Sequence, residues 1–133
     1  MTEPLPSTTV AVTIHRPADA VYAYACEPSS FAEWASGLGS ELVPNGDHWL
    51  AQGPDGPIEV RFSPPNPYGV LDHWVKLASG DEFYIPLRVI ARGDDAEVML
   101  TLLREPDTSD ERHEADAAWV ARDLWTLKTL LEG

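Results

Sequence analysis

The C-terminal segment predicts one long helix, which closes a chain otherwise made of short strands. It opens on residues 108–111 (TSDE), a capping box of the kind that begins helices, and runs to about Leu131. At about 100° per residue it carries one continuous apolar stripe. The stripe consists of Ala117, Val120, Leu124, Leu127 and Leu131. What this stripe packs against is decided by the segments that precede the helix.

Those segments alternate apolar and polar residues, which is typical of half-buried strands. The clearest is residues 8–15 (TTVAVTIH), and further strands are predicted at 42–43, 48–52, 58–62, 70–77, 82–91 and 96–104. Strands followed by one long helix indicate an α+β domain. We therefore expect a single domain over residues 1–133, in which a curved antiparallel sheet of about seven strands wraps around the C-terminal helix. Residues 1–6 are expected to form a flexible tail.

Two short helices are predicted directly after the first strand. Pro17 suits the first position of a helix, and Pro28 ends that helix. A second capping box, residues 30–33 (SFAE), then begins a short helix that carries Trp34. Gly37 and Gly39 are expected to end it.

The charge of the chain excludes two classes of partner. Lys and Arg total 9 whereas Asp and Glu total 22, so the formal net charge is −13. This field repels the phosphates of nucleic acids and anionic membrane surfaces. Cys26 is the only cysteine, which excludes an internal disulfide and fits a reducing compartment. Because no signal peptide or membrane-spanning run is visible, we expect a cytoplasmic protein.

The whole chain resembles the START-like superfamily, also called SRPBCC, helix-grip or polyketide cyclase/dehydrase-like. The similarity rests on the strand Val12–Ile14 and on HRPADAVYAY, EPSSFAEW, NPYGVLDHWV, IPLRV, EVMLTLLR and DAAWVARDLWTLKTLLE. The resemblance implies a helix-grip fold with a cavity between the sheet and the C-terminal helix, which in this family often takes an apolar or aromatic molecule. Because members include ligand carriers, cyclases and chaperone co-factors, the fold alone does not settle the function.

The stretch Asn66–Val75 (NPYGVLDHWV) places an acid, an imidazole and an indole in succession, and neighbours on a strand face opposite sides. Taken as a three-residue loop centred on Gly80, the turn SGD sets His73 opposite Leu87. A loop centred on Asp94 sets Leu87 opposite Thr101. The inner face predicted in this way is apolar except for His73 and Thr101. It contains Leu71, His73, Val75, Leu77, Phe83, Ile85, Leu87, Val89, Met99, Thr101 and Leu103.

The outer face of the same strands then holds an Asp72–Arg88 ion pair and a large apolar patch. We expect a homodimer to cover this patch, which includes Trp74, Pro86, Leu100 and Leu102. A one-residue slip of register, or a bulge at Pro86, would exchange the faces. The cavity would then be lined instead by Trp74, Tyr84 and Arg88.

His73 is the one side chain suited to acid–base chemistry, because its intrinsic pKa lies near neutrality. It is also explained as a core histidine that is hydrogen-bonded to Thr101 or to a carbonyl. The acids Asp116 and Asp123 lie on one edge of the long helix, where they either face a polar end of the cavity or simply meet solvent. The expected ligand-binding residues are His73, Thr101, Met99, Leu87, Phe62, Trp34, Trp119, Val120, Asp116 and Asp123.

Three functions remain open, and binding of a small hydrophobic or aromatic molecule leads. An enzyme of the polyketide cyclase or aromatase type needs polar groups clustered around one reacting point, and one histidine with one threonine is a small set. A role like that of chaperone ATPase activators is a weaker alternative. The four histidines show no metal-ligand spacing, so we expect neither a metal nor another cofactor.

Overall fold

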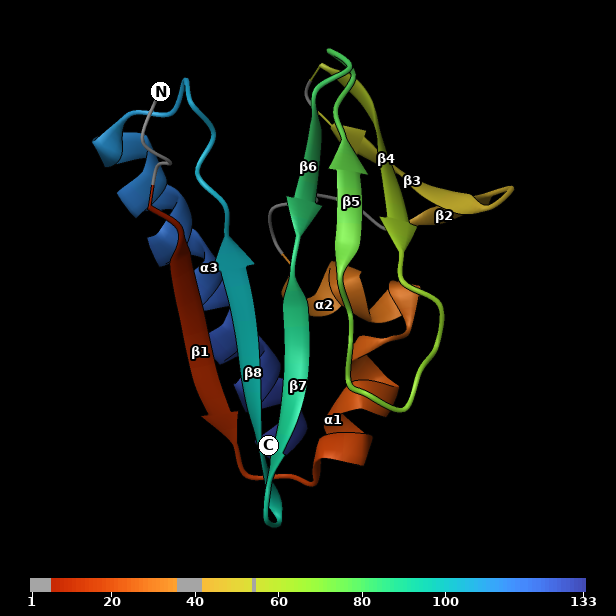
Figure 1. Cartoon of the computed structure of the whole chain (residues 1–133). Coiled ribbons are helices and arrows are strands. Elements are labelled where there is room, and N and C mark those ends of the chain that lie inside the picture. Colours follow the sequence, from red (N-terminus) through yellow and green to blue (C-terminus); the bar gives the residue numbers. More distant parts are fainter. Residues whose placement is uncertain (1–5, 36–41, 54) are drawn as a thin grey trace.

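Two antiparallel sheets join along the chain, and the long C-terminal helix packs against the sheet that contains the first strand (Figure 1). The structure is a computed structural model that describes residues 6–35, 42–53 and 55–133. The predicted tail at 1–6, apart from Pro6, and the predicted helix stop at Gly37 and Gly39 lie outside these residues.

Within the described residues the sheets have three and five strands, and every neighbouring pair is antiparallel. The three-stranded sheet has the order β1 (Thr8–Ile14), β8 (Asp95–Leu102) and β7 (Leu87–Arg92). The five-stranded sheet has the order β2 (Val43–Asn45), β3 (His48–Gly53), β4 (Gly56–Phe62), β5 (His73–Lys76) and β6 (Glu82–Ile85). This is the predicted α+β architecture.

Pro86 explains why the predicted strand 82–91 is two strands. Proline has no backbone N–H and cannot donate to a neighbouring strand, so the segment divides at Pro86 into β6 and β7. The chain continues almost straight through this point (Figure 1). The Thr101 N–H donates to the Pro86 carbonyl (3.0 Å), and the Leu71 N–H donates to the Leu87 carbonyl (2.8 Å). These bonds join the two sheets into one curved surface.

In the described part of the chain, four helical segments accompany the sheet. The segments α1 (Ala18–Ala25), a 3₁₀ turn η1 (Pro28–Ser30) and α2 (Phe31–Trp34) follow β1, and α3 (Asp110–Glu132) ends the chain. The long helix begins at Ser109, whose hydroxyl accepts the Arg112 N–H, one residue later than the predicted capping box. The capping box predicted at Ser30 is wrong, because that hydroxyl donates to the Glu27 carbonyl instead of capping α2.

The register of β5 and β6 differs from the prediction by two residues, which leaves the faces unchanged. His73 lies opposite Ile85 rather than Leu87, because the loop is centred on Ser79. A two-residue shift preserves the alternation of a strand. His73 accordingly points inward and is 5% exposed.

The register of β7 and β8 differs by one residue, which exchanges the faces of β8. Leu87 lies opposite Leu100, not Thr101, because Gly93 and Asp94 form a two-residue turn in which Gly93 has φ +62°. The predicted inner positions Met99, Thr101 and Leu103 are therefore wrong. The inner residues of β8 are Ala96, Val98, Leu100 and Leu102.

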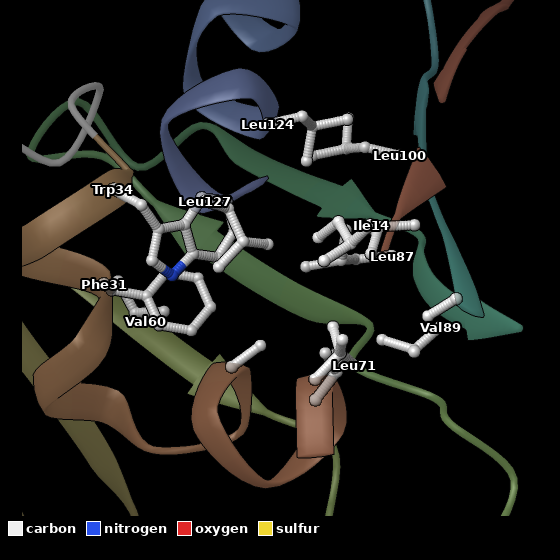
Figure 2. Packing of buried hydrophobic residues seen from close by; sticks show 14 of the residues in the cluster. Ile14, Phe31, Trp34, Val60, Leu71, Leu87, Val89, Leu100, Leu124 and Leu127 are labelled. Carbon is white, nitrogen blue, oxygen red and sulfur yellow. The ribbon is translucent and has the colours of Figure 1, made fainter. Parts of the chain in front are cut away.

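The core fills the space between the curved sheet, α1, α2 and α3 (Figure 2). Leu124 and Leu127 of the predicted stripe are almost completely buried, whereas Val120 and Leu131 pack at its margin. Truncating buried leucines of this kind costs about 2–5 kcal/mol. These residues hold α3 in place over the sheet, and two of them, Val120 and Leu124, line the cavity described next.

Candidate functional site: an aromatic cavity beneath the long helix

A cavity of about 230 Å³ lies between the inner sheet face, α2 and α3. Its walls are almost entirely aliphatic and aromatic. The sheet contributes His73, Val75, Ile85, Leu100 and Leu102, and the helices contribute Phe31, Trp34, Ala35, Val120, Asp123 and Leu124. Among these lining residues His73 and Asp123 are the two with ionisable side chains. An apolar cavity with few polar groups is the usual form of a small-molecule site.

His73 lies at the centre of an aromatic cluster. Its ring meets Phe31 edge-on at 5.5 Å between centroids, and Phe62 lies 5.8 Å away. The Nδ1 atom is 3.1 Å from the Leu71 carbonyl oxygen. Burial lowers the pKa of His73 below its ordinary value of 6.5, because the charged ring loses its hydration. The imidazole is therefore neutral at pH 7.

Phe31 and Trp34 stand at the two ends of the single turn α2, and their rings pack at 4.9 Å between centroids. Trp34 is 4% exposed, and its indole N–H has no hydrogen-bond acceptor within the described part of the chain. Figure 2 shows this nitrogen directed toward the Phe31 side of the core rather than toward Leu100 across the cavity. Trp34 thus contributes an aromatic wall.

Of the ten predicted ligand-binding residues, the structure brings four to the cavity: Trp34, His73, Val120 and Asp123. Leu87 is 1% exposed and belongs to the closed core. Phe62 contacts the His73 ring but does not line the cavity. Trp119 is also absent from the lining and is 46% exposed on α3. Asp116 forms an exposed ion pair with Arg112 (3.0 Å), so the predicted alignment of the two acids at the cavity is wrong for Asp116.

Thr101 and Met99 were predicted beside His73 and lie on the other face of β8. The Thr101 hydroxyl is hydrogen-bonded to the Thr9 hydroxyl at 2.9 Å. The hydrogen-bond partner of His73 is consequently a backbone carbonyl, the second of the two partners considered from the sequence. The residues that sequence reasoning placed outside, Leu100 and Leu102, line the cavity instead.

On the outer face of the sheet, the Asp72 carboxylate accepts several hydrogen bonds although the residue is only 5% exposed. Its carboxylate accepts two bonds from the Arg88 guanidinium, both 2.8 Å, one from the Tyr84 hydroxyl (2.5 Å) and one from the Leu87 N–H (2.9 Å). The predicted Asp72–Arg88 pair is confirmed. It holds the chain together where Pro86 interrupts the sheet.

Stability should depend on pH through this carboxylate. Hydrogen bonds from Arg88, and then from Tyr84 and Leu87, lower the pKa of Asp72 from 3.8 to about 2. Each pKa unit corresponds to about 1.4 kcal/mol, so ionised Asp72 contributes roughly 2 kcal/mol above pH 4, which is lost as the pH falls toward 2. Urea unfolding of the native chain and of Asp72→Asn at pH 5, 4 and 3 should show their difference shrinking. A difference that stays constant would contradict the shift.

The outer face has fewer apolar residues for a dimer contact than the sequence predicts. Trp74 stacks on Tyr84 at 5.2 Å between ring centroids, with Arg61 6.0 Å from the Trp74 ring. Leu100 and Leu102 face the cavity, so they are wrongly assigned to this patch. The alternative lining by Trp74, Tyr84 and Arg88 is also wrong, because all three lie on the outer face with Asp72. Dimerisation through Trp74 and Pro86 stays a prediction.

The described residues also form hollows outside this cavity. A groove of about 600 Å³ lies between the start of α1, the turn at 66–69 and β7. It is wide, and the Tyr22 hydroxyl on its wall already accepts the Asn66 N–H (3.0 Å). A third hollow of about 290 Å³ lies behind Phe62 and Trp49. The inner cavity is the better candidate because it is apolar and contains a buried, polar ring nitrogen.

Within the described ranges, no three His, Cys, Asp or Glu side chains are grouped as metal ligands would be. The same part of the chain contains no helix with the length and apolar character needed to cross a bilayer.

No protein-family model matches the chain, and no curated protein is similar to it in sequence. Solved structures share its fold. DynU16, a protein of the dynemicin biosynthetic locus, superposes with a TM-score of 0.72 at 18% identity, covering 97% of this chain and 48% of DynU16. The chain thus spans about half the length of that neighbour.

Two further neighbours match over most of their length. CalU16 from Micromonospora echinospora has a TM-score of 0.69 at 17% identity, covering 96% of this chain and 74% of CalU16. The Aha1 dimer from Colwellia psychrerythraea has a TM-score of 0.68 at 13% identity, covering 93% and 94%. The antiparallel curved sheet, the long C-terminal helix and these neighbours together show that the chain has the helix-grip fold.

Proposed function

We propose that this protein binds a small apolar or aromatic molecule in the cavity between the sheet, α2 and α3. The observation that carries the proposal is the composition of the walls: nine of the eleven described lining residues have aliphatic or aromatic side chains. Removing apolar ligand surface from water into such a site is favourable by about 25 cal/mol per Å². The origin of DynU16 in a biosynthetic locus supports a small-molecule role.

The size of the cavity restricts the ligand. Pockets for drug-sized molecules usually measure about 300–1,000 Å³, whereas this cavity measures about 230 Å³. One or two fused rings suit this volume, and a long folded chain does not. A cyclase acting on an extended polyketide therefore fits the site less well than a binding protein does.

An enzyme remains the second candidate because His73 and Asp123 line the same cavity. A neutral imidazole is a general base near pH 7, and a carboxylate can assist it. Turnover of a bound ligand that disappears in His73→Leu while binding persists would favour this alternative. A chaperone-activator role rests on the fold shared with Aha1, and a fold alone does not carry a function.

Filling the cavity should abolish binding. Val120→Phe places a larger side chain into the cavity from α3, whereas Ala121→Phe adds an aromatic ring at the next, exposed position. In a thermal-shift screen of one- and two-ring aromatic compounds, a ligand at a hundred times its Kd should stabilise the native chain and Ala121→Phe by about 2.7 kcal/mol. Val120→Phe should show no shift. An equal shift in both variants would place the ligand elsewhere, and no shift with any compound would refute the proposal.

A further inference from the structure

The tautomer of His73 follows from its one hydrogen bond. A carbonyl oxygen can only accept, so the Nδ1 atom 3.1 Å from the Leu71 oxygen must carry the proton. In a neutral imidazole the other nitrogen then has a lone pair and no hydrogen. Nε2 of His73 is thus a hydrogen-bond acceptor.

No donor group of the described residues reaches this acceptor. Nε2 makes no hydrogen bond to any described residue, although the side chain is 5% exposed and lines the cavity. Its ring neighbours are Phe31 and Phe62, which offer no N–H or O–H group. The fully buried side-chain atoms that lack a hydrogen-bond partner within the described residues are the Tyr24 hydroxyl and the Trp34 indole nitrogen, so Nε2 of His73, which is not among them, keeps some accessible surface. A ligand that brings a donor to Nε2 would supply the missing bond.

The surroundings of Nε2 also determine the charge of the ligand. No Lys or Arg is present among the described lining residues, whereas Asp123 is. The carboxylate of Asp72 belongs to the same strand but is bound to Arg88 on the outer face. A carboxylate or phosphate ligand would meet a lone pair, an acid and a protein of net charge −13. An ammonium ion would lose its hydration among the aliphatic walls with Asp123 at one side only.

Building on the proposed function, we propose that the ligand is a neutral one- or two-ring aromatic alcohol, of the phenol or naphthol class, whose hydroxyl donates to Nε2 of His73. The aromatic ring packs against Phe31 and Trp34, where edge-on and offset contacts between rings are favourable. The aliphatic residues of β8 and α3 cover the rest of the ring. A hydroxyl is small enough to reach Nε2 in a cavity of about 230 Å³.

Isosteric ligands separate the hydrogen bond from general hydrophobic binding. We would measure Kd by calorimetry for 2-naphthol, 2-methylnaphthalene and 2-naphthoate with the native chain and with His73→Leu. The methyl group replaces the hydroxyl at similar volume, and leucine removes the acceptor from a site that is otherwise apolar. The ratio of the Kd of 2-methylnaphthalene to that of 2-naphthol should be about tenfold larger in the native chain than in the variant. The naphthoate should bind more weakly than both.

The free ring nitrogen offers a second readout that does not need the variant to fold. The ¹⁵N resonance of His73 Nε2 should move upfield when 2-naphthol binds the native chain and stay in place with 2-methylnaphthalene. If both neutral ligands bind with the same ratio in the two proteins and the resonance does not move, the hydroxyl inference is wrong and the binding function stands. If none of the three compounds binds the native chain, both are wrong.

Discussion

Asp72→Ala is expected to lower the free energy of unfolding by about 3 kcal/mol. The substitution leaves the buried Leu87 N–H without an acceptor, and such an unpaired group costs roughly 1–3 kcal/mol. It also removes the two-bond contact with Arg88 and the bond from Tyr84. Arg88 has 48% of its side chain exposed and recovers hydration, so the loss stays below that of a fully buried pair. Urea unfolding monitored by circular dichroism at pH 7 measures this difference.

Glu82→Ala is the matched control for this substitution. Glu82 of β6 pairs with Arg61 of β4 across the intervening strand β5 on the same outer face, and both side chains are more than 40% exposed. Exposed ion pairs contribute about 0–1 kcal/mol, so Glu82→Ala should change little. Equal losses in the two variants would mean that Asp72 is only another surface charge and does not join the sheets at Pro86.

The inward position of His73 was predictable because a register error of two residues leaves every side chain of a strand on the same face. The sequence places the first loop one residue away from its true centre, Ser79, and this changes the partner of His73 by two positions. Asp72, His73 and Trp74 keep their faces, since side chains repeat every second residue. The ion pair between Asp72 and Arg88 survives because long side chains reach diagonal neighbours.

The faces of β8 could not be predicted with the same security. Treating the turn after β7 as three residues instead of two changes its centre by half a residue, which moves every partner by one. This single difference exchanges Thr101 and Met99 for Leu100 and Leu102. Gly93-Asp94 between two strands is a recognised two-residue hairpin sequence, and its Gly adopts the positive φ that such turns need. Val98 and Leu100 alternate with Glu97 and Met99, and because Met99 is apolar too, this pattern does not show which face of β8 is buried.

Of the aromatic wall from α2, Trp34 was predicted at the cavity, whereas Phe31 was missed for a different reason. Phe31 and Trp34 are three residues apart, so a helix presents both on one face, and this spacing was visible in the sequence. What the sequence does not reveal is how far α2 reaches over the sheet. That placement depends on contacts between distant segments, such as the packing of Phe31 on Phe62 at 4.9 Å between ring centroids. Local patterns carry no information about such distances.

Phe31→Ala is expected to lower the free energy of unfolding by about 3–5 kcal/mol, the usual range for truncating a buried phenylalanine. Phe31 is 2% exposed and its ring contacts Trp34, Phe62 and His73, so its removal leaves a void directly beside the cavity. Phe83→Ala makes the same chemical change at a half-buried position of β6 and should cost clearly less. Chemical unfolding of the two variants measures the difference, and similar losses would contradict the central position of Phe31. Because the void adds volume to the site, the folded fraction of Phe31→Ala should also accept larger ring systems than the native chain does, which calorimetry with three-ring aromatic alcohols would detect.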